Sequence, residues 1–367
     1  MHVPVRTRVL VAVAALVAAT ACTGQPTTGA PRPDRPSRPE SPTTPATPQP
    51  SRPQREPVTT LTVVGDIMLG RGVADQPGGA RARLRPMAAH LRAADLTVGN
   101  LESTLSGDGS PQQGGDSFHA PPAVLDALAG AGVDALSLAN NHTGDYGSAA
   151  LLQTVAAFRD ARIRSFGAGH DLRAATRAAV LTRHGVRFGF LGFNAIGETP
   201  RATPGSPGAL SVRMPPRTGP LERADLAHVL GAVDRLAKRV DVVVVLPHWG
   251  TQYTHVAEPV QSLVGRRLVG AGADLVVGGH PHWVQGLERH EGAVIAHSLG
   301  NFVFDMDFME QTMEGVTLTA RFRGHRLSDV VLTPYRLDAT FSPRPVTGSE
   351  AAAILRDVRR HRVSPDR

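Results

Sequence analysis

Short apolar runs alternate with longer amphipathic stretches between residues 58 and 342. The apolar runs contain Val, Leu and Ala and stop at polar residues or glycine, as buried strands do. Predicted strands of this kind cover residues 61–64, 96–98, 135–138, 240–246 and 273–277. The stretches between them have helical periodicity and predict helices over residues 80–94, 122–131, 148–161, 221–239 and 260–271. This alternation is typical of an α/β domain.

Three further pairs of strand patterns have only a short turn between them. Each turn holds a glycine beside a polar residue, at Gly185, Gly292 and Gly324. The pairs therefore predict hairpins over residues 178–193, 286–297 and 316–337. Together with the helix-linked strands, the hairpins favour one large domain with two sheets over residues 58–342.

Two other segments carry separate expectations. Residues 196–220 are rich in Gly, Pro, Ser and Thr and are expected to form a long surface loop that borders a site. Residues 343–367 are interpreted as a basic C-terminal extension, with a short helix predicted over residues 350–361.

The front of the chain follows neither pattern. Arg6 and Arg8 precede an apolar run over residues 9–21 that is too short to span a bilayer and ends in small residues, as a secretory signal does. Cys22, the only cysteine, comes next, and this place resembles that of the lipid-modified cysteine of bacterial lipoproteins. We therefore expect residues 1–22 to be a lipoprotein signal, and the exported protein to be anchored through Cys22 on the extracellular face of the cell membrane. An ordinary secreted protein is the alternative.

Residues 23–57 contain 11 prolines in 35 positions. This composition cannot bury enough apolar surface to fold, so a disordered linker is expected between the anchor and the domain. Positive charge also gathers at the front, since residues 1–57 hold seven arginines against three acids, a net +4 of the formal +7. The remainder shows no basic patch interleaved with aromatic residues, and nucleic acid is not an expected partner.

Polar side chains follow one predicted strand after another. They are carboxylates, amides and imidazoles, at Asp66, Glu102, Asn140, Asn141, His142, His248, His280, His282 and Asn301. Parallel strands place functional residues at their carboxyl ends, so these side chains are expected to meet. Each alone has an ordinary alternative, such as a helix cap, an Asx turn or a satisfied interior histidine. Together they indicate a metal site, because carboxylate oxygen and neutral imidazole bind Zn, Mn and Fe.

Six motifs at these positions resemble the CapA, or poly-γ-glutamate capsule biosynthesis, family. They are Gly-Asp-Ile-Met-Leu-Gly-Arg (65–71), Gly-Asn-Leu-Glu-Ser (99–103), Ser-Leu-Ala-Asn-Asn-His (137–142), His-Trp-Gly (248–250), Gly-His-Pro-His (279–282) and Ser-Leu-Gly-Asn-Phe (298–302). The resemblance covers roughly residues 59–306, with the motifs in family order. That family is similar to the calcineurin-like metallophosphoesterases, so the resemblance implies an α/β/β/α sandwich with a site for two metal ions.

The resemblance also implies the metal ligands. Asp66 and His282 would bind the first ion, and Glu102 would bridge the two ions. The coordination of the second ion would be completed by Asn141, His248 and His280. The ligand types favour Mn, Fe or Zn, with one or two ions per chain.

The same resemblance bears on His142 and Met68, while Arg71 and Asn301 have roles expected from their own chemistry. His142 would be the general acid that protonates the leaving group. Arg71 and Asn301 would contact substrate; a solvated Arg71 and an Asn301 that orients a ligand or forms a buried turn are the alternatives. Met68 stands where phosphoesterases place a histidine ligand, and a thioether binds hard divalent ions poorly. The first metal site is therefore expected to be the weaker one.

Family resemblance implies a part in making an anionic capsule or envelope polymer of the poly-γ-glutamate type, beside a membrane-bound polymer synthase. No phosphate-binding loop with its lysine is found, so the chain is not expected to be the synthase itself. Two alternatives remain open. One is a stand-alone metal-dependent phosphoesterase that acts on a phosphate ester, and the other is a polymer-binding module that has lost catalysis.

Overall fold

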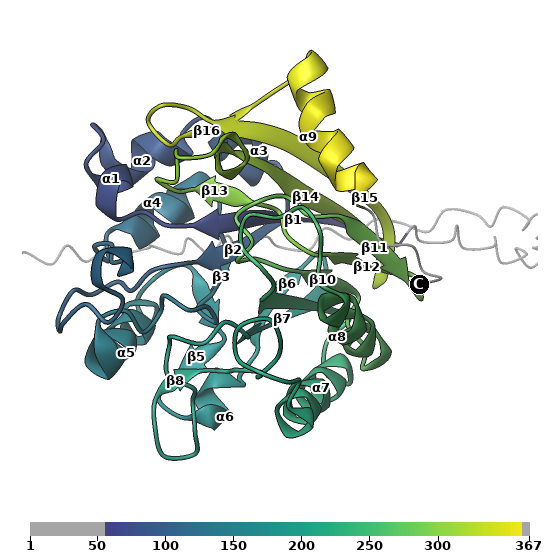
Figure 1. Ribbon diagram of the computed structural model, residues 1–367. Helices are drawn as coiled ribbons and strands as arrows, with labels where there is room; N and C mark the ends of the chain where they lie inside the picture. Colours follow the sequence, from purple (N-terminus) through teal and green to yellow (C-terminus); the bar gives the residue numbers. More distant parts are fainter. Residues whose placement is uncertain (1–55, 362–367) are drawn as a thin grey trace, which may run out of the picture. The chain divides into compact units, whose positions relative to one another are not determined.

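The computed structural model describes residues 56–361. The predicted signal, Cys22 and nearly all of the predicted linker lie outside the described residues. Within them, two sheets pack face to face, with helices on both outer sides (Figure 1). None of the helices in this part of the chain is long and apolar enough to cross a membrane.

The larger sheet carries the N-terminal half of the domain together with its last strands. Its order is β16-β15-β14-β1-β2-β3-β4, and β13 also pairs with β1. The strands β1 to β4 run parallel, β13 lies parallel to β1, and β14 to β16 are antiparallel. Their bounds are β1 (Val58–Ile67), β2 (Leu96–Leu101), β3 (Ala135–Ser137), β4 (Arg164–Phe166), β13 (Asn301–Val303), β14 (Glu314–Arg323), β15 (Arg326–Leu337) and β16 (Pro343–Pro345).

The smaller sheet has the order β11-β12-β10-β9-β7-β6. Its four inner strands are parallel, and the two outermost strands are antiparallel partners in hairpins. The bounds are β6 (Ala179–Arg183), β7 (Val186–Asn194), β9 (Val242–His248), β10 (Leu275–Val277), β11 (Leu287–His290) and β12 (Ala293–Ala296). A separate two-stranded sheet pairs β5 (Ala168–Gly169) with β8 (Gly208–Ala209).

Alternation along the strands builds three apolar layers. Leu61 and Val63 of β1 face Val242 and Val244 of β9 in the layer between the sheets. Val64 and Ile67 instead join the helices of the outer layer on the larger sheet. Those helices are α1 (Arg71–Ala74), α2 (Gly79–Leu84), α3 (Ala88–Arg92), α4 (Val124–Ala131) and α5 (Gly147–Ala157).

The helices on the smaller sheet form the opposite outer layer. Val243 and Val245 of β9 lie in one cluster with Leu226 of α7 and Leu268 of α8. Their bounds are α7 (Arg223–Ala237) and α8 (Pro259–Gly270), and the short α6 (Leu172–Ala175) follows β5. The predicted α/β domain with two sheets is therefore confirmed.

The single helix predicted over residues 80–94 is wrong. The structure has two short helices, α2 and α3, which are separated at Pro86. Proline lacks the backbone N–H that a continuous helix needs, and its ring clashes with the preceding turn.

The C-terminal residues belong to the folded domain rather than to an extension. β16 continues the larger sheet, and α9 (Gly348–Arg360) packs against β14 and β15 (Figure 1). Ile354 and Val358 of α9 are buried in the layer between the sheets. The boundary predicted at residue 342 thus falls inside the packed unit.

Candidate metal centre

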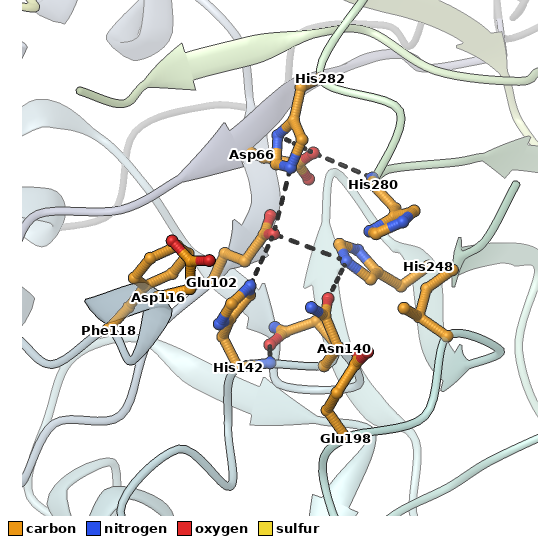
Figure 2. A network of polar contacts seen from close by, with 12 residues as sticks. Asp66, Glu102, Asp116, Phe118, Asn140, His142, Glu198, His248, His280 and His282 are labelled. Atoms are coloured by element: carbon orange, nitrogen blue, oxygen red, sulfur yellow. Dashed lines mark hydrogen bonds and ion pairs between the residues drawn. The ribbon is translucent and has the colours of Figure 1, made fainter. Parts of the chain in front are cut away.

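The candidate ligands meet at the carboxyl ends of strands from both sheets. Asp66 lies in β1, Glu102 follows β2, and His248 ends β9. Gly279 bridges to His248, and this places the loop with His280 and His282 beside them. Figure 2 shows Glu102 at the centre, with His142, His248 and His282 pointing toward it.

Two sets of three ligand atoms lie close enough to hold metal ions. One set is Glu102, His248 and His280, and the other is Asp66, Glu102 and His282. Within each set the atoms lie within 4.8 Å of one another. Glu102 belongs to both sets, with its Oε1 at 3.6 Å from His248 Nε2 and 3.8 Å from His282 Nε2. This sharing matches the bridging position that the family resemblance implies.

Several of these buried atoms have no hydrogen-bond partner among the described residues. They are Oε1 of Glu102, both ring nitrogens of His280 and Nε2 of His282. Leaving a polar atom buried without a partner costs about 1–3 kcal/mol. Here the unpartnered atoms converge, so the residues fit two metal ions with Glu102 between them. Oxygen and imidazole donors without thiolate suit Mn, Fe or Zn.

Burial sets the electrostatics of the ligands. It raises the pKa of Asp66 to about 6, although hydrogen bonds from the His280 backbone and Asn100 act in the opposite direction. Burial, reinforced by the charges of Asp66 and Asp145, raises the pKa of Glu102 well above its usual range. The same burial lowers the pKa of His282 to about 4 and keeps His248 well below its ordinary pKa. Neutral imidazoles are ready to bind a cation, and a cation would favour the ionised carboxylates.

Asn141 contacts a ligand through its amide oxygen. Its Oδ1 lies 2.8 Å from His248 Nε2, and the side chain is only 4% exposed. It therefore sits where the resemblance implies, beside the set formed by Glu102, His248 and His280.

Two asparagines with no predicted role as ligands hold the carboxylates in place. Asn100 Nδ2 donates to Asp66 Oδ1 at 2.9 Å and to Glu102 Oε2 at 3.3 Å. Asn140 Nδ2 in turn donates to Asn100 Oδ1 at 2.9 Å. Both lie inside the quoted motifs, and Asn140 is also one of the polar side chains that follow a predicted strand.

Asn301 supports a ligand rather than substrate. It is fully buried, its Oδ1 lies 2.8 Å from His282 Nδ1, and its Nδ2 donates to Thr312 O at 3.0 Å. The contact leaves His282 Nε2 directed at Glu102, as outer hydrogen bonds commonly orient metal-binding histidines. These contacts favour the alternative that Asn301 orients a ligand over the predicted contact with substrate.

His142 is held by a carboxylate that the sequence did not single out. Asp145 Oδ2 lies 2.8 Å from His142 Nδ1 and accepts the Phe118 N–H at 2.6 Å. The Phe118 ring stacks on His142 with centroids 3.8 Å apart. Gln113 Nε2 donates to the other oxygen of Asp145 at 2.5 Å. These contacts leave His142 Nε2 facing Glu102.

Arg71 lies beside the centre, but its charge is already paired. Its Nε and Nη2 donate to the carboxylate of Asp305 at 3.1 and 2.6 Å, and its guanidinium lies 4.3 Å above the Phe118 ring. A phosphate bound by Arg71 would have to share it with Asp305.

Met68 does not join the ligands, although its position in the motif would suggest it. It is fully buried in the apolar layer between the larger sheet and its helices, and its Sδ accepts the Gly70 N–H at 3.1 Å. The set of Asp66, Glu102 and His282 thus stands without a further imidazole from this position.

The segment predicted to border a site carries a charged pair. Arg217 Nη2 contacts Glu198 Oε1 at 2.6 Å, and Glu198 is among the side chains drawn in Figure 2. The charge of Arg217 contributes, after burial and the neighbouring histidines, to the lowered pKa of His280.

Known proteins resemble this chain over most of the domain. A relative from Bacillus anthracis, named capsule biosynthesis protein CapA, is 32% identical over 297 residues, which cover 79% of this chain and 70% of that protein. The PGA biosynthesis protein CapA of Bacillus subtilis is 28% identical, over 83% of this chain and 78% of its own length. A probable polyglutamine synthesis accessory protein of Mycobacterium tuberculosis is 30% identical, over 68% of this chain and 75% of its own length.

Two solved structures are also similar to this chain at low sequence identity. A hypothetical protein from Thermus thermophilus is 17% identical with a TM-score of 0.44, over 76% of this chain and 99% of that one. A 5'-nucleotidase from Candida albicans is 13% identical with a TM-score of 0.42, over 82% of this chain and 57% of that one.

The family model described as bacterial capsule synthesis protein PGA_cap matches residues 60–306. This range contains every candidate metal ligand, and it agrees with the range over which the motifs resemble the CapA family. The chain therefore belongs to the PGA_cap family of bacterial capsule synthesis proteins.

Proposed function

We propose that this protein takes part in making a capsule or envelope polymer of the poly-γ-glutamate type, beside a membrane-bound polymer synthase. Its family and the names of its relatives support this role. The only lysine, Lys238, follows helix α7 and does not close a glycine-rich phosphate loop. We therefore assign ATP-driven polymerisation to a partner.

The observation that carries a chemical role is the sharing of Glu102 by two ligand sets. Asp66, Glu102 and His282 would hold one ion, and Glu102, Asn141, His248 and His280 the other. Bound divalent ions would polarise a substrate oxygen and supply a nucleophilic water at neutral pH. We infer a hydrolytic site of the metallophosphoesterase type, in keeping with the motif order of the sequence.

We assign the role of general acid to His142. Asp145 holds the Nδ1 side of the ring, so a protonated His142 would donate from Nε2, the nitrogen that faces the ligands. The proton would pass to the oxygen of the leaving group, and the imidazole would become neutral. The Phe118 ring, stacked on His142, restricts its rotation and keeps this orientation.

We also propose that the protein is exported and anchored to the membrane through a lipid on Cys22. The short apolar run before this cysteine and the proline-rich residues after it support the proposal. In that arrangement residues 23–57 would connect the anchor to the domain.

The test combines metal analysis with turnover by the purified chain. We expect bound Mn, Fe or Zn, and hydrolysis of bis(4-nitrophenyl) phosphate that is abolished by chelation and by His142→Ala. Deletion of the gene in its host should also lower the amount of the envelope polymer. Turnover with unchanged polymer would favour a stand-alone phosphoesterase, a role that the His142–Asp145 contact also suits. Protein without metal or turnover would indicate a polymer-binding module and overturn the hydrolytic proposal.

A further inference from the structure

Tyr253 is held beside the metal centre in a strained backbone conformation. Its φ is +60°, in the left-handed region that a bulky side chain rarely adopts. Its backbone N–H donates to Pro281 O at 3.0 Å, between the two histidines of the ligand loop. His280 and His282 also have positive φ. Strain of this kind gathers at functional sites, where the surrounding structure maintains it.

The Tyr253 ring lies between a buried ligand and an exposed aromatic side chain. On one side it stacks on His282, with centroids 6.1 Å apart and planes at 28°. On the other side Phe308 meets it edge-on at 5.6 Å, and Phe308 is 58% exposed. The ring therefore has the ligand set of Asp66, Glu102 and His282 on one side and a solvent-exposed side chain on the other.

The hydroxyl of Tyr253 is an unused hydrogen-bond donor. Within residues 56–361 it has no hydrogen-bond partner, whereas the buried hydroxyl of Tyr335 donates to Asn301 O at 2.8 Å. The ring that carries this hydroxyl stacks on His282, a candidate ligand of the centre. A phenol is protonated at neutral pH and can donate to an anionic oxygen.

We propose that Tyr253 contacts substrate, and that its hydroxyl donates a hydrogen bond to an oxyanion bound at the metal centre. The inference rests on the proposed function of that centre. Arg71 is engaged by Asp305, whereas the hydroxyl of Tyr253 has no partner among the described residues. The hydrogen bond would position the anionic group beside His282 without itself binding metal.

The test compares metal-loaded full-length wild type with Tyr253→Phe, which keeps the stacked ring and removes only the hydroxyl. Inorganic phosphate and acetate serve as probes, and calorimetry measures their binding. We expect unchanged metal content and about tenfold weaker phosphate binding, since a hydrogen bond to a charged group is worth roughly that factor. Tyr146→Phe is the matched control. It removes the same atom from a ring that contacts His119, and its phosphate affinity should equal that of wild type.

The outcomes separate this inference from the proposed function. If Tyr253→Phe binds only phosphate more weakly, the hydroxyl recognises a phosphoryl group. If it binds both probes more weakly, the hydroxyl recognises oxyanions in general. Equal affinity in Tyr253→Phe and wild type would overturn the inference, as would loss of metal from the variant or failure of wild type to bind either probe. If wild type binds phosphate but hydrolyses no ester, the hydrolytic proposal fails while the role of Tyr253 is still decided by binding.

Discussion

The Nδ1 of His142 lies 2.8 Å from Asp145 Oδ2, while Nε2 on the other side of the ring faces Glu102 Oε1 at 3.9 Å. If His142 is the general acid, its loss should slow hydrolysis by about 10²–10⁴-fold. We expect Asp145→Asn to slow hydrolysis less than the loss of His142 does, by about tenfold or more, and to leave the metal content unchanged.

Comparing esters with different leaving groups tests proton donation more directly than the rate on one ester does. A general acid matters most when the leaving oxygen is strongly basic, so both variants should lose more activity on an alkyl ester than on a 4-nitrophenyl ester. Asp126→Asn, on the exposed side of α4, is the control. An equal loss on both esters would argue against proton donation by His142.

Metal content should differ between the two ligand sets. We expect one tightly bound ion in wild type, lost in His248→Ala or His280→Ala, because Met68 supplies no imidazole to the set of Asp66 and His282. Met68→His should raise the content toward two ions per chain. Elemental analysis after dialysis measures both, with His228→Ala on α7 as the control. Two equally tight ions in wild type would contradict the claim that Met68 weakens its site.

Metal affinity should depend on pH through Asp66. The pKa of its carboxyl is raised to about 6, so below that pH a proton competes with the ion. Affinity should therefore rise with pH through about 6, and the ionisation of Glu102, whose pKa is also raised, should add to this rise. The buried histidines add little to this step, because their lowered pKa values keep them neutral already. Metal titrations at pH 5, 6, 7 and 8 check this, and a flat affinity from pH 5 to 7 would refute it.

Helix α9 should be needed for stability. Ile354 is fully buried in the layer between the sheets, so Ile354→Ala should lower the free energy of unfolding by about 2–5 kcal/mol. The neighbouring exposed Arg356→Ala should change it little. Thermal or denaturant unfolding measures both. Equal stability of the two variants would mean that residues 343–361 behave as an extension after all.

Cys22→Ser should release the protein from the membrane. The prediction follows from the position of Cys22 directly after the apolar run. Detergent partitioning of cells that express each form would show it, and retention of the variant in the membrane fraction would exclude the lipid anchor.

Much of the centre could be predicted because its ligands end strands whose apolar patterns are local. The hydrogen-bond partners of the supporting residues could not be predicted, since these contacts are made only by the tertiary fold. Asn301 lies 19 positions from His282, and Gln113 reaches Asp145 from a loop without periodicity. β16 was missed for a related reason. Its two prolines argue against a strand, yet an edge strand with one unpaired side accommodates them.

The ligands come from both sheets, with Asp66 and Glu102 on the larger one and His248 and His280 on the smaller. The sequence has a single cysteine, at position 22, so no disulfide can join the two halves of the domain. An ion bound between them would link the two halves reversibly and oppose their separation. By mass action the strength of this link would follow the free metal concentration. The free energy of unfolding of the domain would then rise with the concentration of free metal around it.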